Sequence, residues 1–367
     1  MNIFTKLKNA KYVQKFIITL SRSLLIIIAG VVMTCVKGMN LGIEFTGGIK
    51  VSVVADDVTD KKEFENTLRK WLEGDRGVSE TGESKNPDNK KFEIKNVTVN
   101  GNNYVVVLGT TMTENGKKVN MLTTKAKFES GKKEITGYVA QRESQDINSE
   151  LTTYLQEKYN AGVTVSSSFV GNESAKWVLK SAIIAVAVAI AVILVYIAIR
   201  FTLLSGLAAI LALIHNVLIM FALTSIFQIS VNQTFIAAIV TIIGYSINST
   251  IVVFDKIREL MKKPSYKEVT DVDIANEAIG ATLKRTILTT LTTLVMIVLL
   301  AVFGTQAIKE FAYPIIFGLV AGAYSSILLA APTWVYLRKL FKQADKKPVQ
   351  KKKKAKNTDK PVVAENA

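Results

Sequence analysis

Residues 181–199 read SAIIAVAVAIAVILVYIAI, nineteen consecutive positions without a charged side chain. About 20 apolar residues in a helix cross the hydrocarbon layer of a bilayer, so this stretch predicts a transmembrane helix. On either side of it the chain holds five further runs of similar length and apolarity. We therefore expect six membrane spans, at residues 16–36, 177–199, 204–227, 232–254, 286–303 and 311–336.

The composition of the 367-residue chain excludes several classes of protein. With 49% hydrophobic residues and a mean hydropathy of +0.28, it is neither a single soluble enzyme domain nor a disordered chain nor a coiled coil. The single cysteine, Cys35, excludes an internal disulfide framework and a multi-cysteine zinc site. The single histidine, His215, lies in an apolar run, which argues against a Ser-His-Asp triad. We expect no enzymatic activity, cofactor or metal site.

The net charge of +16 belongs to the membrane part of the chain, because residues 37–176 contain 20 basic and 20 acidic side chains. Basic residues concentrate before residue 23, in 255–285 and in the tail from Arg338, whereas the 228–231 connection has none. Short loops rich in Lys and Arg stay in the cytoplasm, so both termini are expected there. This distribution explains the charge without nucleic-acid binding. The tail is expected to be disordered and to attract anionic lipid, with the ribosome as an alternative partner.

The first span is expected to remain as a signal anchor, because its apolar core is too long for a cleaved signal peptide and no small-residue cleavage site follows. Lipidation of Cys35 is the alternative, and the preceding Val-Met-Thr argues against it. The expected domains are an N-terminus with span 1 (1–36), an extracytoplasmic α+β domain (37–176), a five-helix bundle (177–337) and a disordered basic tail (338–367).

The extracytoplasmic domain is expected to be ferredoxin-like, from the order β-α-β-β-α-β. Its strands offer edges to which an extended polypeptide could add. Ser149 is assigned as the cap of the second helix. The predicted elements are strands at 48–55, 92–99, 104–108 and 163–170 and helices at 60–72 and 148–159, with a hairpin turn at Asn100-Gly101, a flexible loop at 74–90 and an insertion at 111–146.

Polar side chains inside the spans fall on common helix faces. Because a polar group in lipid needs a partner, such a face indicates either a contact with another helix or a functional site. One interpretation is close packing and hydrogen bonding between helices, and the other is a polar pathway for ions. Arg285 alone suits a cytoplasmic anchor at the end of span 5, and His215 alone suits a packing role. Asp255 is expected to pair with Lys256 or Arg258. The polar positions are Thr241, Tyr245, Asn248 and Ser249 in span 4, Arg285, Thr289, Thr292 and Thr293 in span 5, His215 and Asn216 in span 3, and Gly318, Gly322, Ser325 and Ser326 in span 6.

The spans lack acidic residues over long distances. No carboxylate lies between Lys180 and Phe254, or between Arg285 and Lys309. A self-contained proton pump needs a titratable group in its membrane core, so this chain alone does not suffice for one.

Several stretches resemble the SecD–SecF family of bacterial preprotein translocation, which belongs to the resistance–nodulation–division superfamily, and they resemble its SecF subunits in particular. The stretches are Gly42-Ile-Glu-Phe-Thr-Gly-Gly48, Phe169-Val-Gly171, Val195-Tyr-Ile-Ala-Ile-Arg-Phe201, the run from Gly244-Tyr-Ser-Ile-Asn-Ser to Glu259, Arg285-Thr-Ile-Leu-Thr-Thr-Leu-Thr-Thr293 and Gly322-Ala-Tyr-Ser-Ser326.

The resemblance implies a six-span subunit of a bacterial cytoplasmic membrane that pairs with a SecD-like subunit. Together they would use the proton motive force to help a SecYEG-type translocon export unfolded polypeptides. Arg285 maps onto the family's arginine in the ion pathway. Gly47 and Gly48 map onto its glycine pair, where glycine lets the backbone turn.

The chain departs from the family pattern at three acidic positions. Ser249 and Asn216 stand where the family has aspartates in spans 4 and 3, and Glu44 replaces the aspartate of the first motif. If protons drive the cycle, a carboxylate of the SecD-like partner must carry them beside Arg285. The alternatives are sodium, coordinated by oxygens of Asn248, Ser249 and Thr293, and a structural subunit with weakened ion coupling.

We therefore expect a non-enzymatic subunit that assists protein secretion. One rival is a small-molecule or lipid exporter of the same superfamily, which would usually have twelve spans in one chain. The other is a scaffold without transport.

Overall fold

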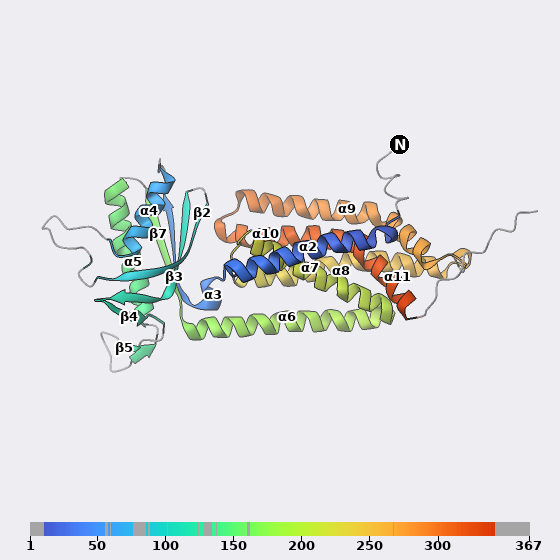
Figure 1. Cartoon of the computed structure of the whole chain (residues 1–367), viewed down its shortest axis with the longest axis horizontal. Helices are drawn as coiled ribbons and strands as arrows, with labels where there is room; N and C mark the ends of the chain where they lie inside the picture. The colour runs from blue at the N-terminus through green and yellow to red at the C-terminus, as the bar shows by residue number, and fades with distance from the viewer. Residues whose placement is uncertain are drawn as a thin grey trace, which may run out of the picture.

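The computed structural model describes residues 11–55, 58, 60–75, 86, 89–100, 102–122, 125–127, 134–136, 138–159, 162–266 and 268–341. Six helices in these ranges are long and apolar enough to cross a membrane, which confirms the predicted number. They run side by side, and a small sheet domain lies at one end of the bundle (Figure 1). The helices are α2 (Phe16–Lys37, preceded by the 3-10 turn η1, Val13–Lys15), α6 (Asn172–Arg200), α7 (Leu203–Ile226), α8 (Gln233–Lys262), α9 (Asp271–Phe303) and the last helix, α10 (Gln306–Ser325) with η3 (Ser326–Ala330) and α11 (Ala331–Leu340).

Two helices extend well beyond their predicted spans. Helix α8 continues to Lys262, and the short turn η2 (Pro264–Tyr266) follows. Helix α9 starts at Asp271, where Thr270 caps it by accepting a hydrogen bond from the amide of Asp273. Arg285, which is expected at the end of span 5, therefore lies within a longer helix, because polar residues before it continue α9.

The last helix contains a π-helical turn, Ser326–Ala330, just before Pro332. Proline has no amide proton, so the regular bond to the carbonyl four residues earlier is missing, and the backbone accommodates this with a wider turn. Pro314 in α10 likewise leaves the carbonyl of Glu310 without its usual helical donor.

Helices α7, α8 and α10 form the centre of the bundle, whereas α2, α6 and α9 lie at its periphery. The most apolar stretch of α7 is 56% buried and that of α2 and α6 only 11%. Small residues bring the central helices together. A Cβ at Gly318 would lie 2.5 Å from Ile242, and one at Gly322 would lie 3.1 Å from Ser246. The glycine pair of span 6 therefore serves close packing of α10 against α8.

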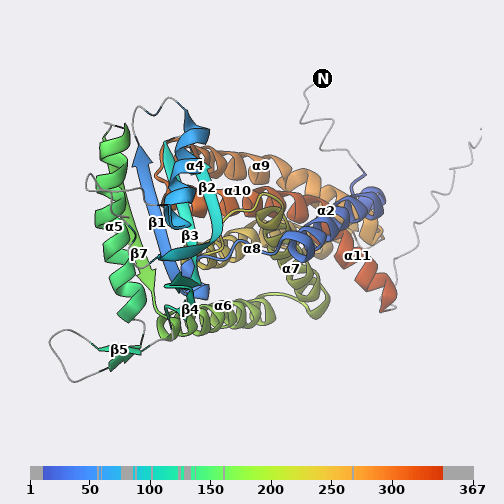
Figure 2. The same cartoon turned by 60° about the vertical axis from the view of Figure 1, so that its left-hand side comes forward.

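The sheet domain has a four-strand path in the order β2-β3-β1-β7, with every neighbouring pair antiparallel and β4 added to β3. Helices α4 and α5 contribute to the same buried cluster as alternate residues of β1, so they cover one face of the sheet (Figure 2). The elements are α3 (Ile43–Thr46), β1 (Gly48–Ala55), α4 (Lys61–Leu72), β2 (Lys91–Asn100), β3 (Asn103–Glu114), β4 (Lys117–Asn120), β5 (Lys125–Lys127), β6 (Glu134–Thr136), α5 (Tyr138–Tyr159) and β7 (Val163–Val170).

The predicted strands at 48–55 and 163–170 are confirmed, and α4 forms as predicted, with the side chain of Asp60 capping it. The hairpin is longer than expected, because β3 continues to Glu114 into the expected insertion. The assignment of Ser149 as a cap is wrong. Helix α5 begins ten residues earlier, and the Ser149 hydroxyl donates within the helix to the carbonyl of Asp146.

Some predicted segments cannot be compared. Most of the expected flexible loop at 74–90, Gly101 of the hairpin turn, and the tail from residue 342 lie outside the described residues.

Candidate functional site

A pocket between α8 and α9 brings together most of the polar residues of spans 4 and 5. Each helix contributes positions three or four residues apart, which places them on one face of that helix. The pocket is lined by Tyr245, Asn248, Ser249 and Val252 of α8 and by Arg285, Thr286 and Thr289 of α9.

The pocket lies far from the sheet domain along both helices. At 1.5 Å per residue, Asn248 is roughly 22 Å from the first residue of α8, and Arg285 is roughly 27 Å from the last residue of α9. Both of those helix ends face the sheet domain (Figure 1). A hydrocarbon layer of about 30 Å that starts at those ends would therefore enclose the pocket.

Arg285 is exposed in this chain, as are its neighbours Asn248 and Thr289. None of the ion pairs formed among the described residues involves Arg285. The cation is therefore presented at the surface of the bundle without a carboxylate from the described part of its own chain.

The hydroxyl groups around Arg285 donate to their own helices. Thr289 donates to the carbonyl of Arg285 at 2.8 Å, Thr293 to that of Thr289 at 3.0 Å, and Ser249 to that of Ser246 at 2.9 Å. A hydroxyl that donates within its helix keeps lone pairs as acceptors. These side chains therefore line an acceptor-rich surface, and Thr293 continues it one turn beyond the pocket.

His215 and Asn216 do not belong to this pocket. The Asn216 side chain is buried and donates to the hydroxyl of Ser246, a buried residue of α8 that does not line the pocket. His215 stacks on Tyr324 with ring centroids 6.3 Å apart, and Tyr324 donates to the carbonyl of Thr19. This group joins α7 to α8, and α10 to α2, as helix-packing contacts do.

Asp255 pairs with Arg200 of α6 at 2.8 Å, so the expected pairing with Lys256 or Arg258 is wrong. Lys256 pairs with Glu259 one turn further along α8. Consecutive residues of a helix point in different directions, so Lys256 points away from Asp255, and Asp255 faces Arg200 of α6.

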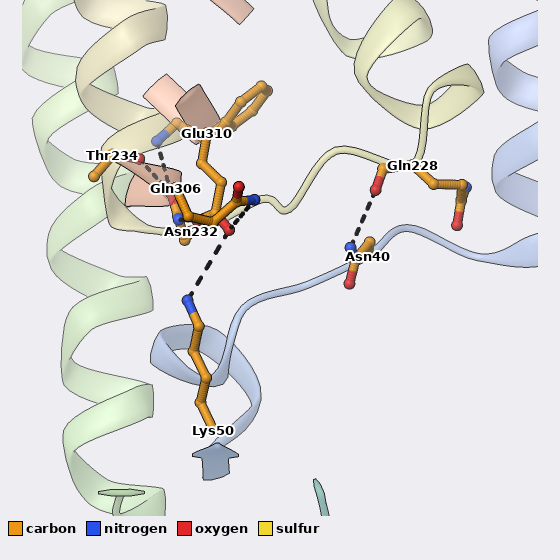
Figure 3. A network of polar contacts seen from close by, with 8 residues as sticks. Asn40, Lys50, Gln228, Asn232, Thr234, Gln306 and Glu310 are labelled. Carbon is orange, nitrogen blue, oxygen red and sulfur yellow. Dashed lines mark hydrogen bonds and ion pairs between the residues drawn. The ribbon is translucent and has the colours of Figure 1, made fainter. Parts of the chain in front are cut away.

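A second polar group lies where the sheet domain meets the bundle (Figure 3). The chain after α2 pairs with the α7–α8 connection. Val231 donates to the carbonyl of Asn40, and Gly42 donates to that of Val231, each at 2.8 Å. Asn40 also donates to the carbonyl of Gln228. The first sequence motif is therefore attached to the outer end of α8.

The residues of that motif do not line the pocket and instead shape the backbone between α2 and β1. Gly47 and Gly48 have φ angles of +67° and +130°, which favour glycine, and they turn the chain from α3 into β1. A Cβ at Gly42 would lie 2.2 Å from a carboxylate oxygen of Glu44 and 3.0 Å from Asn232. Glu44 therefore lies beside this junction.

Glu310 is the residue of this junction that sequence reasoning missed. Its side chain is 8% exposed, and its Oε2 accepts a hydrogen bond from Asn232 at 2.6 Å. In the sequence it directly follows Lys309, and the two opposite charges are interpreted only as cancelling each other in the loop before span 6. The signal that could have found it is Pro314, four residues later, which marks an irregular turn in α10.

Two parts of the chain match a known protein family. Residues 150–340 match the family described as protein export membrane protein SecD/SecF, C-terminal, and residues 32–57 match the SecD/SecF GG motif. The chain is 34% identical over 329 residues to the protein translocase subunit SecF of Sebaldella termitidis, covering 89% of this chain and 91% of that protein.

Two longer proteins contain a matching part. The protein translocase subunit SecDF of Bacillus subtilis is 32% identical over 84% of this chain and 35% of its own length. The crystal structure of SecDF from Thermus thermophilus, a translocon-associated membrane protein, matches 91% of this chain and 38% of that one, with a TM-score of 0.66 and 27% identity. In both, the matched part is a minority of a longer chain.

Proposed function

The chain belongs to the SecD/SecF family of protein export membrane proteins, and from this premise we propose that its Arg285 pocket is half of an ion pathway that a SecD-like partner completes. The subunit acts as an accessory of protein translocation. In our proposal the passage of ions at the interface between the two subunits drives a motion that assists export.

One observation carries the proposal, the exposed Arg285 beside Asn248 and Thr289, roughly 27 Å along α9 from the end that faces the sheet domain. A charged side chain in the hydrocarbon costs a few kcal/mol on insertion scales and normally faces a partner or a water-filled cavity. In the described part of this chain Arg285 has neither a carboxylate partner nor a covering helix, so a second polypeptide is expected to supply both.

The existence of fused SecDF relatives supports the identity of that polypeptide. In the proteins from Bacillus subtilis and Thermus thermophilus, this chain aligns with one part of a longer molecule. The remainder of such a molecule corresponds to the subunit that we propose as the partner here. Its membrane helices would cover α9, whose apolar side chains are largely exposed.

We propose the proton as the coupling ion, carried by a carboxylate of the partner next to Arg285. Ser249 stands in the pocket where the family has an aspartate, so this chain does not supply that carboxylate itself. Sodium is the alternative, because the oxygens of Asn248, Ser249 and Thr293 lie on the same surface. Asn216, the other substituted position, does not line the pocket and donates to Ser246.

We place the protein in the bacterial cytoplasmic membrane with both termini in the cytoplasm, since the start of α2 and the end of α11, which adjoin the stretches rich in Lys and Arg, lie away from the sheet domain (Figure 1). The sheet domain would then be extracytoplasmic, and its strand order and connections support a ferredoxin-like arrangement. It would meet the polypeptide that leaves a SecYEG-type translocon, with β2 and β7 as the outer strands available for pairing.

The direct test replaces Arg285 in cells that also express the SecD-like subunit. Arg285→Met should reduce the gradient-dependent part of secretion by about tenfold, equivalent to roughly 1.4 kcal/mol. The matched control is Lys284→Met, which removes the neighbouring exposed cation that does not line the pocket. Secretion of a Sec-dependent preprotein is followed by pulse–chase.

Equal secretion by the Arg285→Met and Lys284→Met variants would overturn the proposal and leave a scaffold role. Abundance of both variants is measured in the same membranes, so that a loss of protein is separated from a loss of coupling.

A further inference from the structure

Glu310 lies where three segments far apart in the sequence meet (Figure 3). Its two carboxylate oxygens have different neighbours. Oε2 accepts from Asn232 at 2.6 Å, and Oε1 lies 4.0 Å from the ammonium of Lys50. Nothing in the proposed ion pathway uses this carboxylate, whose partner Asn232 lies 13 residues before Tyr245, the nearest pocket residue of α8.

Asn232 attaches Glu310 to the start of α8. The side-chain oxygen of Asn232 caps that helix by accepting from the amide of Phe235, and it also accepts from the hydroxyl of Thr234. Its amide nitrogen is the group that donates to Glu310. One side chain therefore fixes the outer end of α8 against α10.

Lys50 belongs to a central strand of the sheet, β1. Strand β1 pairs with β3 on one side and β7 on the other, and Lys50 is opposite Val107 and Ser168. Its side chain points out of the domain toward the bundle (Figure 3), where it is 26% exposed. A displacement of Lys50 therefore moves the sheet domain as a unit.

We propose that Glu310 is a positioning residue that couples the sheet domain to the outer ends of α8 and α10 through Lys50 and Asn232. A shift of α8 and α10 driven from the membrane then carries β1, and with it the domain. The use of this coupling in export rests on the proposed function, whereas the mechanical link itself does not.

The link is tested on the full chain in complex with its SecD-like partner, using spin labels. The exposed native cysteine is first removed by Cys35→Ser. One label pair, at Lys61→Cys in the domain and Phe303→Cys at the outer end of α9, reports the placement of the domain on the bundle. A second pair, Lys61→Cys with Thr164→Cys, lies wholly within the domain. All three label positions are exposed.

Without any ion gradient, Glu310→Gln and Lys50→Met should each broaden the domain-to-bundle distance distribution and leave the distribution within the domain unchanged. Lys50→Arg keeps the charge and should behave as the unmodified protein. The matched control is Glu173→Gln, an exposed carboxylate at the same end of the bundle. An unchanged domain-to-bundle distribution in Glu310→Gln, or equal broadening within the domain, would overturn the proposal.

A second arm uses proteoliposomes with an imposed ion gradient. The domain-to-bundle distance of the unmodified complex should shift with the gradient, and Glu310→Gln should abolish that shift. If the unmodified complex shows no shift, the ion-coupling function fails, while the broadening in the first arm still decides the link.

Discussion

At the scale of single residues, Arg285 brings a positive charge to the pocket between α8 and α9. Its guanidinium cannot give up its proton, so it must be accommodated as a charge. The pocket around it offers acceptor oxygens from Asn248, Ser249 and Thr289 but no carboxylate. This is why the account places the missing negative charge on another subunit.

Tyr104 illustrates the opposite case in the sheet domain, a buried polar atom without a partner. Its hydroxyl is fully enclosed and makes no hydrogen bond among the described residues, whereas the hydroxyl of Tyr159 donates to Thr67 at 2.9 Å. Tyr104→Phe should leave the free energy of unfolding unchanged or raise it by up to about 1 kcal/mol, and Tyr159→Phe should lower it by about 1 kcal/mol. Urea unfolding of the full chain measures both, and a larger loss for Tyr104→Phe would contradict the assignment.

Tyr104 also predicts a pH dependence of stability. Burial, followed by the nearby charges of Glu65, Tyr159 and Asp60, raises the pKa of Tyr104 above 10.0. As the pH rises through that value, the unfolded chain releases this proton before the folded chain does, so the folded state loses stability. Tyr104→Phe should weaken this alkaline loss.

At the scale of helices, the contact between α10 and α8 depends on glycine. A Cβ at Gly318 would come within 2.5 Å of Ile242. A Cβ at Gly244, in contrast, would have no atom of a neighbouring segment of the described chain within 4 Å. Gly318→Ala should therefore lower the melting temperature of the detergent-solubilised protein. Gly244→Ala, the matched control, should be neutral or stabilising by up to about 1 kcal/mol from helix propensity. Equal effects would show that close packing does not occur at this point.

Apolarity and periodicity were sufficient to predict the elements that are either apolar throughout or strictly alternate between apolar and polar residues. The six spans and the strands at 48–55 and 163–170 show runs or alternation that few other structures would satisfy. The start of α5 was missed because its first turns are mostly polar, with buried Val139 and Ala140 as the only apolar pair before Ile147. The first turns of α9 were missed because Asp271, Asp273 and Glu277 interrupt the apolar run by which span 5 was recognised.

The candidate site was only partly predictable. Helical spacing alone placed Tyr245, Asn248 and Ser249 together, and the helix partner supplied Arg285 and Thr289. Spacing along α7 could not reveal that Asn216 meets Ser246, which does not line the pocket. It also could not show the pairing of Asp255 with Arg200, because the relative rotation of two helices depends on their packing.

At the scale of the whole molecule, the arrangement of the sheet domain on the bundle comes from contacts between distant parts of the chain. Asn232 and Glu310 are 78 residues apart, and Lys50 comes from a different domain. No local pattern encodes such a meeting point. It is nevertheless the contact through which a motion in the membrane would reach the sheet domain.

The central claim is that ions pass at an interface built from Arg285 and a SecD-like partner. Ion flux in proteoliposomes containing both subunits tests it most directly, with pH-sensitive and sodium-sensitive dyes read in parallel. We predict that the unmodified complex dissipates a proton gradient and that Arg285→Met abolishes this flux while Lys284→Met preserves it. A complex that conducts neither ion, or an Arg285→Met complex that conducts as well as the unmodified one, would contradict the account.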